Sequence, residues 1–267
     1  MTEYVSHGDP RRSMALLWGK CEPPTRGPKQ ALTVPEIVAA AVDLADTEGL
    51  GAVSMRKVAD RLGRSPMALY TYVPAKAELL DLMLDSVLGE VTTDYPYDQG
   101  WRAAAEASAR AGWAFYERHP WVLQISQARS LLGPHELDLY EAQLRIFDGL
   151  PLTGRDVNRL VTVMSDFVRG AARAVHDARQ APKATGLTDD EWWTTRSALL
   201  EEMAPPDMWA TRWPTITRIG EEAAFDQQDR EPGDDTPYIV WELLDSFEFG
   251  LQRLLDGIER YISSRAP

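Results

Sequence analysis

The sequence predicts an all-α protein, and three observations carry this prediction. Apolar residues recur three or four positions apart through most of the chain, which is the spacing of one helix face. Residues that cap helices precede these stretches, and glycine or proline follows them. No group of segments alternates apolar and polar residues as the strands of a sheet do. We therefore expect a small helical domain followed by a larger one.

The composition excludes several classes of protein. The 267 residues include 1 Cys, so an intrachain disulfide cannot form and cysteine-based zinc sites lack ligands. No stretch approaches the roughly 20 apolar residues of a membrane span. The 4 His form no zinc-protease motif, and the sequence has no nucleophile elbow or phosphate-binding glycine loop. We expect a cytoplasmic protein without enzymatic activity, cofactor, bound metal or membrane contact.

Residues 1–31 are rich in glycine and proline, which interrupt helices and strands, so they are predicted to form a flexible arm. The arm is basic. Arg26 and Lys29 are candidate DNA contacts, in the manner of homeodomain arms that enter a minor groove. A solvated tail is the alternative, and translation from Met14 would shorten the arm.

Two helices are predicted next. The first begins at a capping box made by Thr33 and Glu36, with Pro35 in its first turn, and it ends at Gly49. Ser54 can cap the second helix, which ends at Gly63.

A third, very short helix is predicted over residues 66 to about 72. Ser65 is placed as its N-cap, Pro66 at its first position, and Pro74 ends it. Two short helices joined at a glycine are a candidate helix-turn-helix motif. The second helix of such a motif presents its outward residues to base edges in the major groove of DNA.

The inward face of this short helix consists of Leu69 and Val73, which leaves the other side chains for DNA. Arg64 suits guanine, and Tyr70 can donate a hydrogen bond to a phosphate. The remaining candidates are Ser65, Met67, Ala68, Thr71 and Tyr72. The alternative is a tight helical corner whose aromatic residues belong to the core.

The net charge of −13 argues against nucleic acid only if it is spread evenly. Residues 1–80 hold 10 basic and 9 acidic residues, whereas residues 81–267 hold 18 basic and 32 acidic residues. Within residues 52–76, five basic residues stand against Asp60 alone. A small basic unit therefore precedes a large acidic one.

Residues 32–90 resemble the DNA-binding domain of the tetracycline-repressor (TetR) family. The resemblance rests on Ser54-Met55-Arg56-Lys57-Val58-Ala59, Leu62-Gly63, Ala68-Leu69-Tyr70-Thr71-Tyr72-Val73 and Lys76 before Leu79-Leu80. It implies a helix-turn-helix DNA-binding domain over 32–76 and a helical ligand-binding and dimerisation domain over 77–267. It also makes Arg56 a DNA contact and Lys76 a phosphate contact at the start of a fourth helix. Thr71 replaces a larger aromatic residue of some members, so the operator sequence is not implied.

The acidic part is predicted to contain helices over residues 101–118, 136–148, 156 to about 178, and 237 to about 262. Residues 181–236 are expected to form an irregular connection rich in tryptophan and proline, with short helices in it. Small residues along 101–118 leave room for a ligand cavity, although tight helix packing explains them equally well.

Large flat side chains suit a pocket for an aromatic or polycyclic molecule. The pocket candidates are Trp113, Tyr116, Trp121, Phe147, Met164 and Phe167, each of which could instead belong to the core. By resemblance, the last two long helices pair with their copies in a four-helix bundle between subunits. The interface candidates are Val161, Val168, Val175, Leu244, Phe247, Leu251 and Leu255, with packing inside one chain as the alternative.

The function implied is that of a homodimeric repressor that leaves a palindromic DNA operator when a small hydrophobic or aromatic inducer binds. An activator of the same family is an alternative that the sequence does not separate from a repressor. A helical binding or catalytic protein without specific DNA affinity is a further alternative. Tetracycline repressors hold a magnesium-bound drug partly through a histidine, and residues 120–134 contain none, so sensing of metal-bound tetracycline is not predicted.

Overall fold

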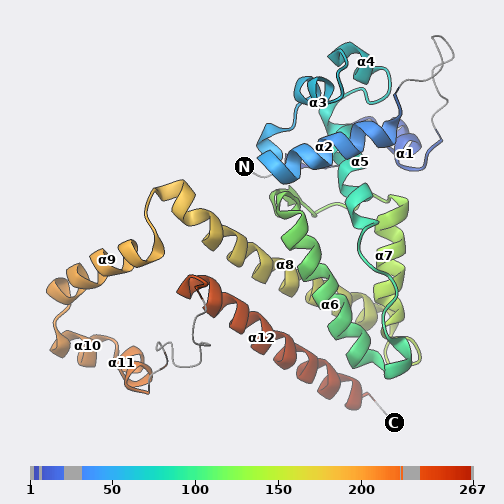
Figure 1. The fold of residues 1–267 in the computed structure, drawn as a ribbon. Coiled ribbons are helices and arrows are strands. Elements are labelled where there is room, and N and C mark those ends of the chain that lie inside the picture. Colours follow the sequence, from blue (N-terminus) through green and yellow to red (C-terminus); the bar gives the residue numbers. More distant parts are fainter. Residues whose placement is uncertain (1–2, 6–7, 21–31, 223, 225–234, 266–267) are drawn as a thin grey trace. The chain divides into compact units, whose positions relative to one another are not determined.

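The computed structural model describes residues 3–5, 8–20, 32–222, 224 and 235–265 (Figure 1). Helices make up most of these residues, which confirms the predicted all-α class. Two strands of two residues each, β1 (Glu3–Tyr4) and β2 (Ile125–Ser126), pair in parallel. The chain divides into two compact units, Met1–Ala172 with Gly250–Pro267, and Arg173–Phe249.

Three helices form the first group of the larger unit: α2 (Val34–Glu48), α3 (Met55–Arg61) and α4 (Pro66–Tyr70), with a 3-10 turn, η1 (Leu50–Ala52), after α2. The predicted capping box is confirmed, because Thr33 N–H donates to Glu36 Oε2 at 2.7 Å. Ser54 caps α3 by accepting from the backbone of Lys57 at 3.2 Å. Ser65 is the N-cap residue of α4, as predicted, although its side chain makes no capping hydrogen bond. Pro66 occupies the first position of α4, where its fixed φ favours the helical backbone.

The fourth helix, α5 (Lys76–Leu88), begins at the predicted residue and packs against α2. The core between these helices consists of apolar side chains that are almost fully buried: Ile37, Leu44, Val58, Leu69, Val73 and Leu79. Burying Leu69 and Val73 fixes α4 on the other helices, and so determines which α4 side chains face solvent.

The prediction of a flexible arm over residues 1–31 is wrong for a large part of its described residues. Pro10–Leu17 form a helix, α1, which Asp9 caps by accepting from Arg12 N–H at 2.8 Å. Leu16 and Leu17 are buried in the same core as α2 and α5, and α1 packs against α5. Proline at the first helical position starts this helix, so its presence there does not indicate disorder. The arm residues Arg26 and Lys29 lie outside the described residues.

The remaining helices of the larger unit agree closely with the prediction. They are α6 (Trp101–Arg118), α7 (Pro134–Arg145), the part of α8 (Gly154–Thr185) up to Ala172 and the part of α12 (Tyr238–Ser263) from Gly250. Short 3-10 turns, η2 (Tyr97–Gln99) and η3 (Pro120–Gln124), flank α6. No helix among the described residues is both long enough and apolar enough to cross a membrane.

The end of α12 is fixed on α6 and on the start of α8. Arg102 of α6 donates to Asp256 at 2.7 Å and to Glu259 at 3.2 Å. At the other helix, the Tyr261 hydroxyl donates to Asp156 at 2.9 Å. These bonds tie together helices more than a hundred residues apart in the sequence, and Figure 1 shows α12 running beside α6 and α8 there.

The burial of the predicted interface residues differs from the expectation. Six of the seven are buried within the single chain: Val161, Val168, Val175, Phe247, Leu251 and Leu255. Leu244 is half-buried. These six side chains are covered within the single chain, and the residues at which two copies would meet stay a prediction. The helical spacing of these apolar residues indicates that they are buried. It does not show whether the same chain or a second subunit covers them.

The second unit replaces much of the irregular connection predicted over residues 181–236. Three helices lie there: α9 (Asp189–Met203), α10 (Pro206–Arg212) and α11 (Pro214–Glu221). Thr188 and Glu191 form a capping box at the start of α9, with Thr188 N–H donating to Glu191 at 2.8 Å. The prolines start α10 and α11, where a missing N–H costs nothing.

Candidate DNA-binding helix and ligand cavity

The turn between α3 and α4 has the backbone that a helix-turn-helix needs. Gly63 has φ of +62°, a left-handed conformation that favours glycine. The next residue, Arg64, donates its N–H to the carbonyl of Ala59 at 2.9 Å, which closes the end of α3. A side chain at position 63 would strain this turn, so Gly63 sets how α4 leaves α3.

The predicted DNA contacts that the structure describes are either exposed or half-buried. Arg56, Arg64, Ser65, Met67, Tyr70 and Thr71 are exposed, and Met67 and Tyr70 retain 73% and 41% of their accessible surface. Ala68 and Tyr72 are half-buried, and Tyr72 packs partly against the core. The α4 surface thus offers an arginine, a phenol and an apolar side chain together.

Acidic residues of α2 neutralise part of the basic surface. Lys57 Nζ lies 2.8 Å from Glu48 Oε2, and Arg61 pairs with Asp43. The hydrogen bond from Lys57 holds the pKa of the Glu48 carboxyl below its ordinary value. Arg56, by contrast, is exposed and forms no ion pair with any residue that the structure describes. The sequence count of charges in residues 52–76 therefore overstates the number available to phosphates.

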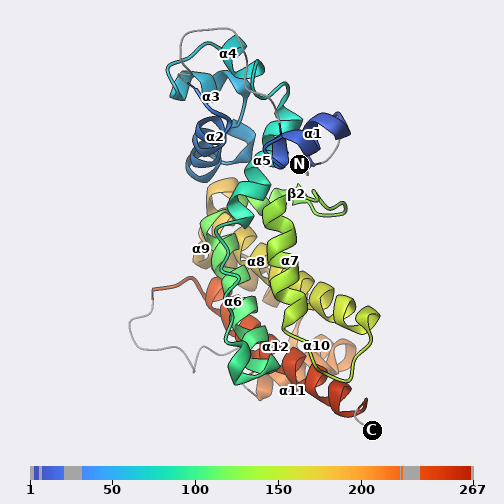
Figure 2. The same cartoon turned by 90° about the vertical axis from the view of Figure 1, so that its right-hand side faces the viewer.

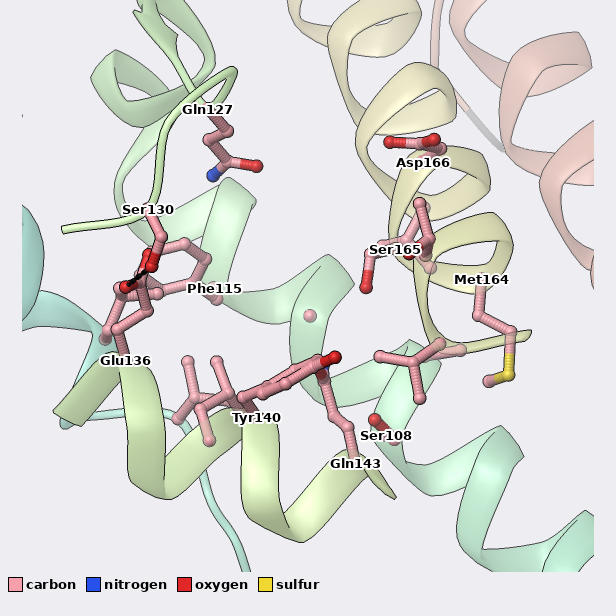
Figure 3. Close-up of a pocket in the computed structure, with 18 of the residues that line it drawn as sticks. Ser108, Phe115, Gln127, Ser130, Glu136, Tyr140, Gln143, Met164, Ser165 and Asp166 are labelled. Atoms are coloured by element: carbon pink, nitrogen blue, oxygen red, sulfur yellow. Dashed lines mark hydrogen bonds between the residues drawn. The ribbon is translucent and has the colours of Figure 1, made fainter. Parts of the chain in front are cut away.

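A cavity of about 550 Å³ lies in the larger unit (Figure 3). Its walls come from the end of α5 (Leu84 and Leu88), from α6, α7 and α8, and from the segment that follows β2. Figure 3 shows Gln127 and Ser130 of that segment on one side, Ser165 of α8 on the other, and Tyr140 and Gln143 of α7 below. A volume of this size and a largely apolar wall suit a drug-sized organic molecule.

Three of the six predicted pocket residues line this cavity: Tyr116, Phe147 and Met164. The other three do not. Trp121 is fully buried in the core, Trp113 lies off the cavity on α6, and Phe167 packs where a side chain at Gly250 would stand, 2.9 Å from the Cβ position there. The selection by size and aromaticity did not distinguish cavity wall from helix-to-helix contact.

Sequence reasoning missed the polar lining of the cavity. Its polar residues include Ser108, Gln127, Arg129, Tyr140, Gln143 and Asn158. They come from α6, the segment after β2, α7 and α8, so no local spacing in the sequence brings them together. Burial raises the pKa of the Tyr116 phenol, and the nearby Arg169 partly offsets this, so the phenol stays neutral and can donate a hydrogen bond at ordinary pH.

A polar junction joins the cavity-bearing helices to the amino-terminal group. The buried His119 places Nδ1 2.8 Å from Asp46 of α2 and Nε2 3.2 Å from Glu90, just after α5. Trp121 Nε1 also donates to Asp46, at 2.7 Å. Arg118 donates to Glu90 as well, at 3.1 Å.

The junction predicts a pH dependence of stability. Burial raises the pKa of Glu90, but hydrogen bonds from His119 and Arg118 outweigh it, so the folded pKa lies below the ordinary value of 4.5. A lowered carboxyl pKa stabilises the fold above the unfolded value, and this contribution disappears as pH falls through the folded one. The melting-temperature difference between wild type and Glu90→Gln should therefore be largest near pH 7 and shrink below about pH 4.5.

Glu141→Gln, at an exposed site on α7, is the matched control. If the melting-temperature difference between wild type and Glu90→Gln did not change across this pH range, the ionised Glu90 would not stabilise the fold.

The turn at Gly63, the exposed face of α4 and the helical body behind them define a helix-turn-helix DNA-binding protein with a helical carboxy-terminal domain. Two family models match its two parts. Residues 37–83 match "Bacterial regulatory proteins, tetR family", and residues 95–231 match "Tetracyclin repressor-like, C-terminal domain". The chain belongs to the TetR family of transcription regulators.

Named relatives agree with this assignment. The chain is 40% identical over 267 residues to the HTH-type transcriptional repressor DrrR1 of Streptomyces coeruleorubidus, with 99% of this chain and 91% of the relative covered. It is 33% identical over 187 residues to an HTH-type transcriptional regulator of Saccharopolyspora erythraea, covering 70% and 75% of the two chains. The solved structure of Streptomyces coelicolor ActR in complex with actinorhodin has the same fold, with a TM-score of 0.65, 23% identity, and 87% and 99% of the chains covered.

Proposed function

We propose that this protein is a repressor that releases its DNA operator when a small hydrophobic or aromatic molecule enters the cavity. One observation carries the proposal: α5 begins at Lys76, next to the DNA-binding helix, and ends with Leu84 and Leu88 in the cavity wall. A single rigid helix thus touches both sites. A ligand that favours one position of α5 must change DNA affinity, and DNA must change ligand affinity by the same factor.

We further propose that the repressor acts as a homodimer on a near-palindromic operator. A two-fold dimer presents two α4 helices to two half-sites, about one helical turn of DNA or a small multiple apart. Because six of the seven predicted interface residues are buried within one chain, we assign the interface to exposed apolar side chains of the same two helices. Val163 of α8 retains 49% of its accessible surface and Phe249 of α12 retains 63%. Changing each to aspartate should convert dimer to monomer in sedimentation.

The direct test is a mobility shift on the DNA upstream of the protein's own gene. Actinorhodin, which the related ActR structure contains, is the first compound to add, followed by a panel of aromatic antibiotics and polyketides. The proposal expects a shifted band that a compound abolishes in a saturable manner. Tryptophan fluorescence, titrated with the same compounds, measures ligand binding without DNA. Absence of any specific shift would refute the DNA-binding function.

Filling the cavity should separate DNA binding from release. Gly112 of α6 lines the cavity, and a Cβ there would meet Val168 at an ordinary 3.5 Å. Gly112→Leu puts additional carbons into the space a ligand needs, so it should bind DNA as wild type does and require at least about tenfold more compound for release. Gly112→Ala is the matched control, since it adds one methyl group without crowding. If the same concentration of compound released both variants from DNA, the ligand would bind outside this cavity.

A further inference from the structure

We propose that residues 3–5 and 8–18, here called the amino-terminal strap, compete with DNA for Lys76 and connect this competition to the wall of the cavity. The inference rests on the proposed function, because it concerns how ligand and DNA exclude each other. In this view the docked strap is a built-in part of the released state of the repressor.

The strap holds the cavity wall at both of its ends. Glu3 and Tyr4 pair in parallel with Ile125 and Ser126, and Ser126 itself lines the cavity. At the other end, Trp18 Nε1 donates to the carbonyl of Leu132 at 3.0 Å. Between these anchors, Gln127, Arg129 and Ser130 line the cavity. Figure 2 shows β2 beside the upper end of α7 and below the amino-terminal helices. A ligand that orders this wall therefore also favours the docked strap.

The strap also reaches the candidate phosphate contact. Glu3 Oε1 lies 3.6 Å from Nζ of Lys76, the first residue of α5, and both side chains are more than a third exposed. A phosphate and the Glu3 carboxylate are both anions, so they compete for the same ammonium group. Binding of DNA at Lys76 should displace Glu3, and docking of Glu3 should weaken the hold on DNA.

The strap is held weakly enough to be released. It covers Glu78 of α5, whose side chain is buried and whose Oε2 atom accepts no hydrogen bond from the described residues. Gly8 passes so close that a Cβ there would lie 2.5 Å from Glu78 Oε1. Covering a carboxylate oxygen without a partner costs free energy, which opposes the gain from burying Val5, Leu16 and Leu17. The cost of covering Glu78 and the gain from burying the apolar side chains oppose each other, so the strap can be either docked or undocked.

The first test measures DNA affinity of Glu3→Gln, which keeps the shape of the side chain and removes its charge. An ion pair of this exposure is worth up to about 1 kcal/mol, so the variant should bind DNA about two- to fivefold more tightly. Asp60→Asn, on α3, removes one exposed negative charge and controls for general electrostatics. In a Lys76→Ala background, Glu3→Gln should give no gain. A gain that persists without Lys76, or that Asp60→Asn reproduces in full, overturns the proposal.

The second test measures amide hydrogen exchange of the full chain, with and without the DNA upstream of its own gene. DNA should speed exchange at residues 3–5 and 125–126, because it displaces the strap, and it should slow exchange at α4. Protection at α4 with unchanged exchange in both strands overturns the strap and leaves the proposed function standing. A chain that binds no DNA contradicts the proposed function, and the inference falls with it.

Discussion

Replacing Arg64 and Tyr70 together by alanine should lower affinity for the operator by about 100-fold or more. Each side chain is exposed beside or on α4, the helix that the Gly63 turn presents. One good arginine contact to a base is worth about 1–3 kcal/mol, and a lost phosphate contact adds to this. A dimer would lose both contacts in each half-site. Mobility-shift titration of the pair and of each single variant measures the effect.

Two controls make this result specific. Arg159→Ala removes an exposed arginine from α8, far along the chain from α4, and should leave DNA affinity unchanged. Thermal melting should show that the double variant is folded, since exposed substitutions of this kind change stability by about 0.5 kcal/mol or less. Wild-type affinity in a folded double variant would rule out α4 as the helix that reads the operator.

Trp121→Ala should cause the largest loss of stability of any change considered. The side chain is almost fully buried, and its Nε1 donates to Asp46 across two parts of the larger unit. Removing a buried tryptophan leaves a cavity and costs about 3–5 kcal/mol. For a chain of this length we expect the melting temperature to fall by about 10 °C. Calorimetry or circular dichroism measures it.

Two further tryptophan variants test the cause of that loss. Trp121→Phe retains most of the packing and removes the hydrogen bond, so it should cost about 1–2 kcal/mol. Trp192→Ala changes a tryptophan of α9 that retains 41% of its surface, and should change the melting temperature little. If Trp121→Ala had the same melting temperature as Trp192→Ala, the junction at Asp46 would not stabilise the fold.

Local signals explain which elements the sequence predicts well. The capping box at Thr33, the first-turn prolines and the glycine at position 63 act within a few residues, so the start of α2 and the turn before α4 are predictable from local sequence. The start of α5 at Lys76 has no capping side chain, and it was predicted from the resemblance to the TetR family. The helix α1 was missed although Asp9 and Pro10 give the same kind of signal. Its glycine and proline neighbours suggested disorder, and its stability comes from burying Leu16 and Leu17 against α5, far along the chain.

The DNA-binding surface is easier to predict from the sequence than the cavity is. The exposed α4 side chains follow from one helix and its inward face. The cavity depends on how several helices meet, so Trp121 and Phe167 were misplaced, and the polar residues from Ser108 to Asn158 gave no local signal. Periodicity likewise marked Leu251 and Leu255 as buried without telling whether the cover is the same chain or a second copy.

The ion pairs of α2 with Lys57 and Arg61 bear on how this regulator searches a genome. Because Glu48 and Asp43 already engage two of the cations near α4, few counterions are released when the protein meets arbitrary DNA. Affinity for arbitrary DNA should then be low, and few molecules would be trapped at the millions of competing sites in a chromosome. A small number of copies per cell would suffice to keep one operator occupied.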